Sequence, residues 1–397
     1  MAAQRTVKIG IVSPETGPMA GFAEPTAFVV RQVLQAMRDK ITINGKTYPF
    51  QIIVKDTQSS PNRAADVALE LIQRDKVDMV LSYGGPETAN PASDQCELNG
   101  VPSLSTAVPI EPWFYGRGGD PKTGFDWTYI HFFDGATYAN SILSFIKKVS
   151  TNKTMGGLWP NDADGIALSK AFSGVFGRAG YRIVDPGRFD LPASTYSTQI
   201  AAFKAANCEL AQCVVPPSAF ALFWDQCAQQ GFHPKVMIAS KSSEYPPSVK
   251  PLGERARGIG VPIWFTRAYP FKSTITGQGA TEIIKAYEAA SGRQWAATLG
   301  STHAMLEVMI DALNRTKDIN DRASVRDALK ATKMTTLIGN VDFSKGSVPN
   351  ASPMGVVMVQ WDKAPKGSAY PLDMFVVDNA MAPAIPVDRA PFPIPYA

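Results

Sequence analysis

The chain has 397 residues, and at roughly 100 to 200 residues per domain this length predicts two domains, each with its own hydrophobic core. Hydrophobic residues make up 45% and charged residues 19%, a composition that excludes a mainly disordered chain. The net charge of +4 is spread without a run of five Lys or Arg residues. The sequence therefore indicates neither a nucleic-acid-binding stripe nor a polybasic membrane patch.

Membrane and export signals are missing from the sequence pattern. No apolar stretch approaches the ~18 to 20 residues that a membrane-spanning helix needs. The first five residues lead directly into an apolar run and lack the apolar core of a signal peptide. This start fits a cytoplasmic protein, and it equally fits a secreted protein whose signal peptide has been removed.

The cysteine pattern excludes two kinds of site. The four cysteines, Cys96, Cys208, Cys213 and Cys227, form no C-x-x-C pair, so a zinc ribbon and a thioredoxin-type site are not expected. Cys208 and Cys213 are close enough in sequence for one local disulfide, and the sequence leaves this question open.

The first elements predict a β-loop-α unit followed by a hairpin. Val7–Ser13 is a nearly continuous apolar run, typical of a parallel strand that is buried on both faces, and apolar residues at helical spacing follow over Pro25–Met37. Asn44-Gly45 lies between two strand-like runs and predicts a β-hairpin. Ser60 and Pro61 are typical of the first positions of a helix, which we expect to run to about Arg74.

The same alternation continues through the middle of the chain. A long aromatic loop is expected over Pro109–Phe132, and such loops often carry function. The expected strands are Val77–Ser82, Val101–Ser105, Thr154–Trp159, Tyr181–Pro186, Gln212–Val215 and Val236–Ala239, and the expected helices are Glu87–Leu98, Ala136–Val149, Gly165–Ala179 and Phe220–Gln230. Alternating strands and helices predict open, mostly parallel sheets with helices on both faces.

One sheet cannot comfortably hold this many strands, so we expect two lobes with a break near residue 133. The remaining chain predicts a strand over 258–265, helices over Gly279–Ala290, Leu299–Leu313 and Asp321–Ala331, and a strand pair at Gly355–Trp361 and Met374–Asp378. The proline-rich end, Pro383–Tyr396, is expected to be an extended tail on the surface.

No catalytic or metal-binding motif is present. The sequence contains no G-x-S-x-G, H-E-x-x-H or P-loop motif and no G-x-G-x-x-G after the first strand, and its three histidines are far apart. The segment Asn161–Gly165 is superficially similar to a calcium loop, but its Gly comes one position early and the closing Glu is missing. We therefore expect no enzyme activity, no cofactor and no metal site, although Asp164 remains a candidate for facing a ligand.

The loops that follow the strands are the strongest functional signal, because ligands of open α/β sheets bind at the carboxyl ends of the strands. Gly17–Phe22, Tyr83–Thr88 and Thr106–Pro109 follow three such strands and are rich in small residues. Exposed backbone N–H groups and the start of the helix at Pro86 would suit a carboxylate. The alternative is that these segments are only tight turns. Phe22, Tyr83 and Trp113 are candidates for an apolar wall, or for simple packing.

At these residues the chain resembles the leucine/isoleucine/valine-type (type I) periplasmic solute-binding proteins of ABC transporters. The similar stretches are Val7–Gly21, Asp56–Arg74 and Val77–Pro109, and the resemblance extends to about residue 345. It implies an α/β fold of two doubly wound, mostly parallel-sheet lobes joined by three crossovers, near residues 133, 262 and 345. It also implies that the lobes close around a solute and so signal the membrane permease.

The resemblance further implies the domain limits, the location and the partners. One lobe would comprise residues 1–133 and 263–345, the other residues 134–262 and 346–380, and residues 381–397 would form the tail. The protein would be periplasmic, with its signal peptide removed, and monomeric. It would bind a small organic acid or amino acid and the ABC permease membrane subunits, and no nucleic acid.

The family's ligand-binding positions fall on defined segments of this chain. Its carboxylate site corresponds to Pro86–Thr88 and Ala107–Pro109, and its positions on the other lobe lie near Asp162–Asp164, Pro216–Ala219 and Ser240–Ser242. The candidate binding residues are therefore Phe22, Tyr83, Pro86, Glu87, Thr88, Thr106, Ala107, Pro109, Trp113, Asp164, Ser218, Ser240 and Lys241.

One departure from the family bears on the ligand. Amino-acid binders carry an acidic residue for the ligand ammonium after the strand matching Val236–Ala239, whereas this chain has Lys241, with Glu244 only further on. A lysine would repel an ammonium, so we expect a small organic acid, aromatic acids included, ahead of a branched-chain amino acid. The alternative is that Lys241 is a solvated surface charge.

Two other functions remain open from the sequence. The same fold could serve as a cytoplasmic sensor domain that regulates a partner, and a signal peptide in the gene would distinguish import from sensing. An enzyme would need a catalytic site assembled from distant residues, for example Asp164 with Lys241.

Overall fold

The computed structural model describes residues 5–396, which divide into two compact units. Unit 1 comprises the chain up to Asp134 together with Tyr269–Met354, and unit 2 comprises Gly135–Ala268 and the chain from Gly355 onward. Each unit contains a seven-stranded sheet with flanking helices. The predicted fold class, two doubly wound, mostly parallel lobes joined by three crossovers, is therefore confirmed. Among the described residues no helix is long and apolar enough to cross a membrane.

The sheet of unit 1 has the strand order β14-β6-β5-β4-β1-β3-β2. All neighbouring strands are parallel except the hairpin pair β2 and β3. The strands are β1 (Val7–Ser13), β2 (Lys40–Ile43), β3 (Lys46–Asp56), β4 (Met79–Ser82), β5 (Ser103–Ser105), β6 (Thr128–Phe132) and β14 (Ala351–Pro353). A separate hairpin pairs β12 (Lys333–Thr336) with β13 (Gly339–Asp342).

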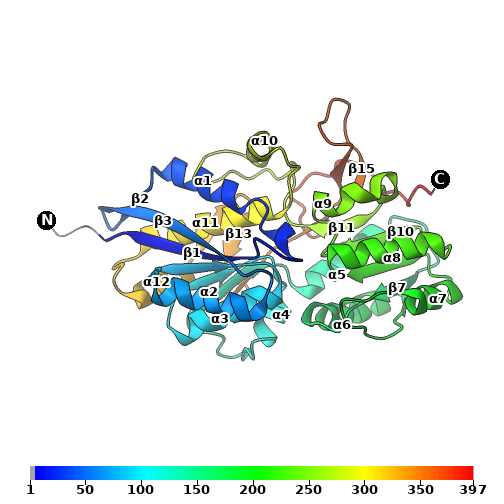
Figure 1. Ribbon diagram of the computed structural model, residues 1–397, viewed down its shortest axis with the longest axis horizontal. Coiled ribbons are helices and arrows are strands. Elements are labelled where there is room, and N and C mark those ends of the chain that lie inside the picture. The colour runs from blue at the N-terminus through cyan, green and yellow to red at the C-terminus, as the bar shows by residue number, and fades with distance from the viewer. Residues whose placement is uncertain (1–4, 397) are drawn as a thin grey trace. The chain divides into compact units, whose positions relative to one another are not determined.

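Helices cover both faces of this sheet (Figure 1). On one face lie α2 (Pro61–Gln73) and α3 (Pro86–Leu98), and on the other lie α1 (Thr26–Met37) and α11 (Thr298–Arg315). Unit 1 also contains the 3₁₀ helix η1 (Ala20–Phe22) and the helices α4 (Ile110–Tyr115), α10 (Ala280–Ser291) and α12 (Arg322–Lys330).

Two local predictions in unit 1 are confirmed. The turn between β2 and β3 has Asn44 at φ 47° and Gly45 at φ 75°, the two positive angles that a type I′ hairpin turn requires. The side chain of Ser60 accepts a hydrogen bond from the Arg63 backbone N–H at 3.4 Å, and Pro61 is the first residue of α2. Sequence signals of this kind identify elements whose conformation is decided locally.

The sheet of unit 2 has the strand order β16-β15-β11-β10-β9-β7-β8. Only β15 is antiparallel to its neighbours, β11 and β16, and all other neighbouring strands are parallel. The strands are β7 (Thr154–Leu158), β8 (Arg182–Val184), β9 (Leu210–Val214), β10 (Val236–Ser240), β11 (Gly260–Ile263), β15 (Val357–Lys363) and β16 (Leu372–Asp378). The central strands β7, β9 and β10 are buried at every residue.

This burial requires cover on both faces of the unit 2 sheet. The helices are α5 (Gly135–Ile146), α6 (Ala163–Arg178), α7 (Ser197–Ala205) and α8 (Pro217–Gln229), with the short α9 (Pro246–Val249) and the 3₁₀ helix η2 (Lys250–Ala256) beside them. Of these, α5 and α6 pack against each other, and α5 contacts β11, β15 and β16. The carboxyl ends of the parallel strands in each unit are the edges where a ligand is expected.

The expected loop over Pro109–Phe132 is wrong in part, because it contains the helix α4 and the strand β6. In α4, Ile110, Trp113 and Phe114 are spaced at helical intervals and buried. The sequence also missed α7, the β12–β13 hairpin and β14. The strands of the hairpin and β14 have only three or four residues each. All four cysteines have free, buried thiols.

The chain changes unit between Asp134 and Gly135, between Ala268 and Tyr269, and between Met354 and Gly355. The segment after residue 345, which the sequence assigned to the second lobe, begins instead within unit 1, because β14 pairs with β6 there. We propose that these three changes of unit are the domain limits.

Candidate functional site

The candidate site of unit 1 is the edge where β5, β4 and β1 end side by side. The backbone N–H of Gly85 donates to the Ala107 carbonyl at 3.1 Å, and that of Thr106 donates to the Ser82 carbonyl at 3.1 Å. The Thr106 hydroxyl donates to the His131 carbonyl at 3.1 Å. The structure therefore brings together the two predicted segments, Tyr83–Thr88 and Thr106–Pro109.

The turn after β4 depends on two glycines. Gly84 and Gly85 have φ angles of 107° and 88°, which only glycine adopts readily. A Cβ atom on Gly84 would lie 2.6 Å from the Pro14 Cγ atom, so the backbone of the turn packs directly against the loop after β1. The Thr88 hydroxyl, which lies 3.1 Å from both the Tyr83 and the Gly84 carbonyls, fixes the turn from the other side.

We expect the substitution Gly84→Ala to lower the free energy of unfolding by about 2 to 4 kcal/mol, from backbone strain and the clash with Pro14. Gly85→Ala is the matched control, because its Cβ would meet the movable end of the Glu87 side chain rather than a rigid ring. Urea unfolding measures both. Equal losses in the two variants would contradict the close packing on Pro14.

Two adjacent backbone donors at this edge lack acceptors. Ala107 has φ 53° and is 3% exposed, and Val108 is fully buried. Within residues 5–396, no hydrogen-bond acceptor is found for the N–H group of either residue. Since buried backbone donors are nearly always paired, these two N–H groups are suited to an anionic ligand atom.

The first turn of α3, in contrast, already contains an acidic side chain of the protein itself. Glu87 lies half-buried in that turn, where the helix dipole favours a negative charge. Pro86 and Pro109 are buried and have no N–H to donate. The donor pair is therefore Ala107 and Val108; the sequence included Val108 in the predicted segment but did not identify it as a binding residue.

The predicted aromatic wall is largely part of the interior of unit 1. Phe22 is 6% exposed at the end of η1, and Tyr83 is fully buried. The Tyr83 hydroxyl accepts from the Ser13 hydroxyl at 3.1 Å and is hydrogen-bonded to that of Thr26, so it joins β1, β4 and α1. Burial raises the pKa of Tyr83, which stays neutral.

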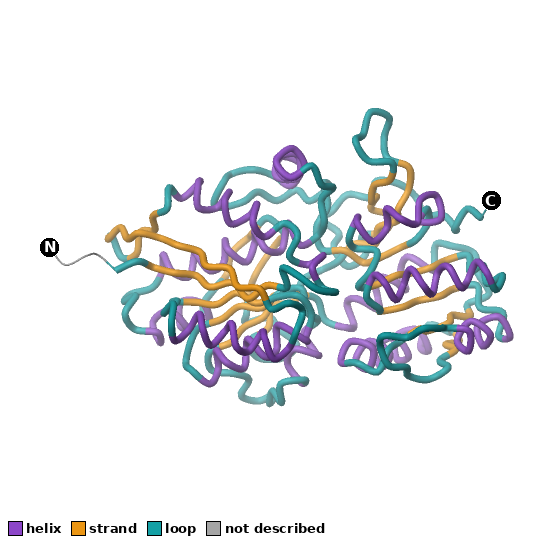
Figure 2. Tube along the Cα trace, in the orientation of Figure 1, coloured by secondary structure: helices purple, strands orange, loops and turns teal. Residues whose placement is uncertain are grey.

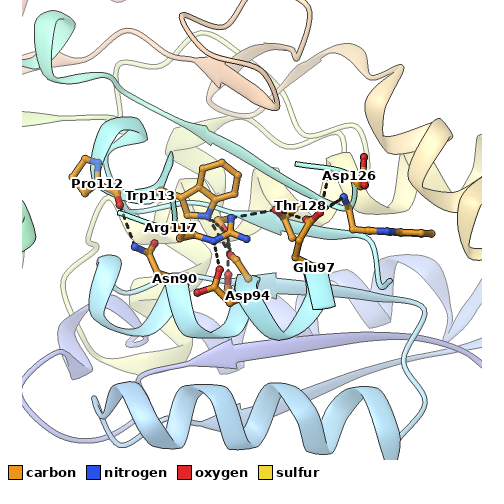
Figure 3. Close-up of polar contacts among 12 residues, drawn as sticks. Asn90, Asp94, Glu97, Pro112, Trp113, Arg117, Asp126 and Thr128 are labelled. Carbon is orange, nitrogen blue, oxygen red and sulfur yellow. Dashed lines mark hydrogen bonds and ion pairs between the residues drawn. The ribbon is translucent and has the colours of Figure 1, made fainter. Parts of the chain in front are cut away.

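Trp113 belongs to a polar network beside α3 (Figure 3). Its indole N–H lies 3.2 Å from the Ser93 hydroxyl and 3.1 Å from the Ser105 hydroxyl. The Arg117 guanidinium lies 4.6 Å from the Trp113 ring centroid and donates from Nε to Asp94 at 2.7 Å. These contacts give Trp113 a structural role, and we do not carry it into the proposed site.

The Arg117 side chain is fully buried, whereas that of its partner Asp94 is 50% exposed. We expect Asp94→Ala to cost about 2 kcal/mol of unfolding free energy, because it leaves a buried guanidinium without its carboxylate. Asp94→Asn, which keeps an acceptor, should lose less. The midpoint of urea unfolding tests both, and an unchanged midpoint for Asp94→Ala would contradict the role given to this ion pair.

The corresponding edge of unit 2 contains a buried group of charges that we call the acid–base cluster: Asp164, Lys241 and Glu244. Lys241 follows β10 at φ 66°, and its Nζ lies 2.7 Å from Asp164 Oδ2 in the first turn of α6. Both side chains are nearly fully buried, at 6% and 5% exposure. The Lys241 backbone N–H donates to Glu244 Oε1 at 3.2 Å. The alternative that Lys241 is a solvated surface charge is therefore wrong.

The net charge of the acid–base cluster decides whether Lys241 would repel an ammonium group on the ligand. Burial raises the pKa of Glu244 to about 7, against the opposing effects of the Lys241 backbone N–H and ammonium. With Glu244 protonated, the charges of Lys241 and Asp164 cancel, and with Glu244 ionised the cluster carries one negative charge. Lys241 by itself therefore does not exclude an ammonium group on the ligand.

Other polar groups line the same strands. The Trp159 indole N–H donates to the Gln212 side chain, whose amide N–H₂ donates to the Ser240 hydroxyl at 3.3 Å. Burial raises the pKa of the Tyr138 hydroxyl, which lies near Ser240. The sequence missed Gln212 and Trp159 because they stand within or directly after apolar strand sequences.

The remaining predicted positions in unit 2 differ in their surroundings. Asp162 caps α6, since its Oδ1 accepts from the Gly165 backbone N–H at 2.7 Å. Ser218 is exposed in the first turn of α8. Over residues 5–396, no group of three or more His, Cys, Asp or Glu side chains could hold a metal ion.

Comparison with known proteins agrees with this arrangement. A family model described as periplasmic binding protein matches residues 6–367. The leucine-binding protein LivK of Thermotoga maritima is 19% identical, with a TM-score of 0.77 over 94% of this chain and 99% of that chain. The substrate-binding protein LivJ of Streptococcus pneumoniae, in complex with isoleucine, is 16% identical, with a TM-score of 0.74 over 94% of this chain and 100% of that chain.

A third structure differs in its bound ligand. The ABC-transporter solute-binding protein of Rhodopseudomonas palustris BisB5, in complex with 3,4-dihydroxybenzoic acid, is 19% identical, with a TM-score of 0.73 over 96% of this chain and 99% of that chain. At these identities the three structures show the fold alone, whereas the family model covers most of the sequence. The chain therefore belongs to the periplasmic binding protein family, in its leucine/isoleucine/valine type, and is a solute-binding protein rather than an enzyme.

Proposed function

We propose that this protein binds a small carboxylate-bearing solute for import by an ABC transporter. The observation that carries the proposal is the pair of buried, unpaired N–H donors of Ala107 and Val108 at the strand ends of unit 1. Two adjacent donors suit the oxygen atoms of a carboxylate. Family membership supports the solute-binding role.

The acid–base cluster supports a choice between two solute classes. With Glu244 protonated, the cluster is neutral and suits an uncharged polar end, such as the hydroxyls of a hydroxylated aromatic acid. We therefore place an organic acid first. An amino acid is the second candidate, because two carboxyl groups face one lysine and Glu244 could ionise against a bound ammonium. The similar structures include proteins in complex with each class.

Isothermal titration distinguishes the two classes. We expect 3,4-dihydroxybenzoate or benzoate to bind, and the amide of the same acid to bind at least about a hundredfold more weakly, because it lacks the charge that the donor pair recognises. Leucine and isoleucine, with their amides, form the second series. Micromolar leucine binding without a response to any aromatic acid would reverse the order, and equal binding of acids and amides would contradict carboxylate recognition.

The transport setting is part of the proposal. We place the protein in the periplasm, with the permease subunits of an ABC importer as its partners, as family membership supports. Fractionation of cells that produce the full-length gene product tests this location. Recovery in the periplasmic fraction is the expected result, whereas a strictly cytoplasmic protein would favour the alternative of a sensor that regulates another protein.

A further inference from the structure

Unit 2 contains a second cavity, of about 140 Å³, that the proposed solute site does not use. Its walls include Trp224 and Cys227 of α8, Phe232 of the following loop, and Ile394 and Tyr396 of the C-terminal segment. That segment is a loop up to Tyr396 (Figure 2). The cavity is therefore covered on one side by residues 394–396.

Three polar groups of the wall are bound to other parts of the protein. The Trp224 indole N–H donates to the Arg255 carbonyl at 3.1 Å, and the Tyr396 hydroxyl donates to the Pro234 carbonyl at 2.8 Å. The Arg255 guanidinium at the rim pairs with Asp225 at 2.7 Å. The rest of the wall is mostly ring faces and carbon atoms, so it offers a ligand mainly apolar contacts.

The sequence of the C-terminal segment explains how it covers the cavity. From residue 391 to residue 396, prolines alternate with Phe392, Ile394 and Tyr396, and these three residues make the anchoring contacts. Phe392 exchanges two hydrogen bonds with the Gln360 side chain, at 3.0 and 2.7 Å, and the Ile394 N–H donates to the Lys235 carbonyl at 2.8 Å.

Because prolines have no N–H group, this segment cannot extend a sheet, and a few bonds at alternate residues hold it. Close packing adds to them, since a Cβ atom on Gly258 would lie 2.9 Å from the Ile394 Cα atom. A cover held in this way can open without unfolding the strands beneath it.

The volume and the lining indicate the occupant. An apolar cavity of about 150 Å³ is known to hold one benzene molecule. We propose that unit 2 binds one uncharged, single-ring aromatic molecule of about this size in the cavity, with Ile394, Pro395 and Tyr396 as its lid. The site is separate from the carboxylate-binding edge of unit 1, and its aromatic walls provide edge and face contacts to the ring.

Titration of the full chain with benzene tests this proposal, using calorimetry and one-to-one saturation as the criterion. Ala228 lines the cavity and is exposed on α8, so Ala228→Trp fills the space from the rim without disturbing the core. We expect this variant to bind benzene at least about tenfold more weakly than the wild type. Deletion of residues 394–397 should weaken binding by at least the same factor, because it removes the lid.

Labelling of Cys227 provides the second readout. Its thiol is 1% exposed, and alkylation of this residue, quantified by peptide mass spectrometry, should be slow in the wild type and slower still with benzene. Deletion of residues 394–397 should accelerate it. Absence of saturable benzene binding, or unchanged binding in Ala228→Trp, would overturn the site. Unchanged binding and labelling in the deletion variant would overturn the role of the lid.

Discussion

The substitution Lys241→Met is expected to lower the free energy of unfolding by about 3 to 5 kcal/mol, since it leaves the Asp164 carboxylate buried without its counter-ion. Methionine preserves the length of the aliphatic stem, so the loss reports on charge rather than on packing. The cost is large because Asp164 is 4% exposed and cannot recover its hydration without a change in α6. Urea unfolding at neutral pH measures the change.

A double-mutant cycle separates this pair from other effects. Asp164→Leu alone should also destabilise the protein, because it leaves the Lys241 ammonium buried, whereas the double variant Lys241→Met with Asp164→Leu should recover most of the loss. Additive losses in the double variant would show that the two side chains do not depend on each other. The 2.7 Å contact would then not account for the stability of this edge.

Glu244 is expected to make the stability of the protein fall as the pH rises. Its folded-state pKa is raised by burial from 4.5 to about 7, so between these values the folded state holds a proton that the unfolded state has released. The contribution of Glu244 is thus most favourable below about pH 4.5 and is lost as the pH rises through about 7. A shift of this size corresponds to about 3 kcal/mol.

The variant Glu244→Gln isolates this contribution. Its amide stays neutral and can still accept from the Lys241 backbone N–H, so unfolding free energies measured between about pH 5 and about pH 8 should fall less steeply than in the wild type. Glu254→Gln is the matched control, because the Glu254 side chain is 69% exposed. Identical pH profiles for the wild type and Glu244→Gln would show that Glu244 is ionised throughout this range.

Much of the fold could be predicted because its signals are local. Buried parallel strands such as β1 show continuous apolar runs, and the Asn44-Gly45 turn and the Ser60 cap each depend on two or three adjacent residues. The α4 helix could not be recognised, because only six residues carry it and its burial depends on contacts with distant strands. The strand β14 likewise forms only because β6 offers it a partner.

The sequence predicted which segments form the candidate site, but it did not predict which atoms in them are available to bind a ligand. Loop composition pointed to Thr106–Pro109, but the unpaired donors of Ala107 and Val108 arise from the left-handed backbone at Ala107, which the sequence does not reveal. Lys241 was recognised as unusual. Its pairing with Asp164, 77 positions away, means that its charge alone does not exclude an ammonium group on the ligand.

We propose that the backbone N–H groups of Ala107 and Val108 bind the carboxylate of the solute. Amide proton chemical shifts of the ¹⁵N-labelled, deuterated protein during titration with benzoate, and separately with leucine, test it most directly. We expect one of these acids to move the backbone amide protons of Ala107 and Val108 strongly downfield, as charge-assisted hydrogen bonds do. The carboxamide derivative of the same acid should leave both signals in place. Tight binding of either acid with both amide signals unmoved would contradict it.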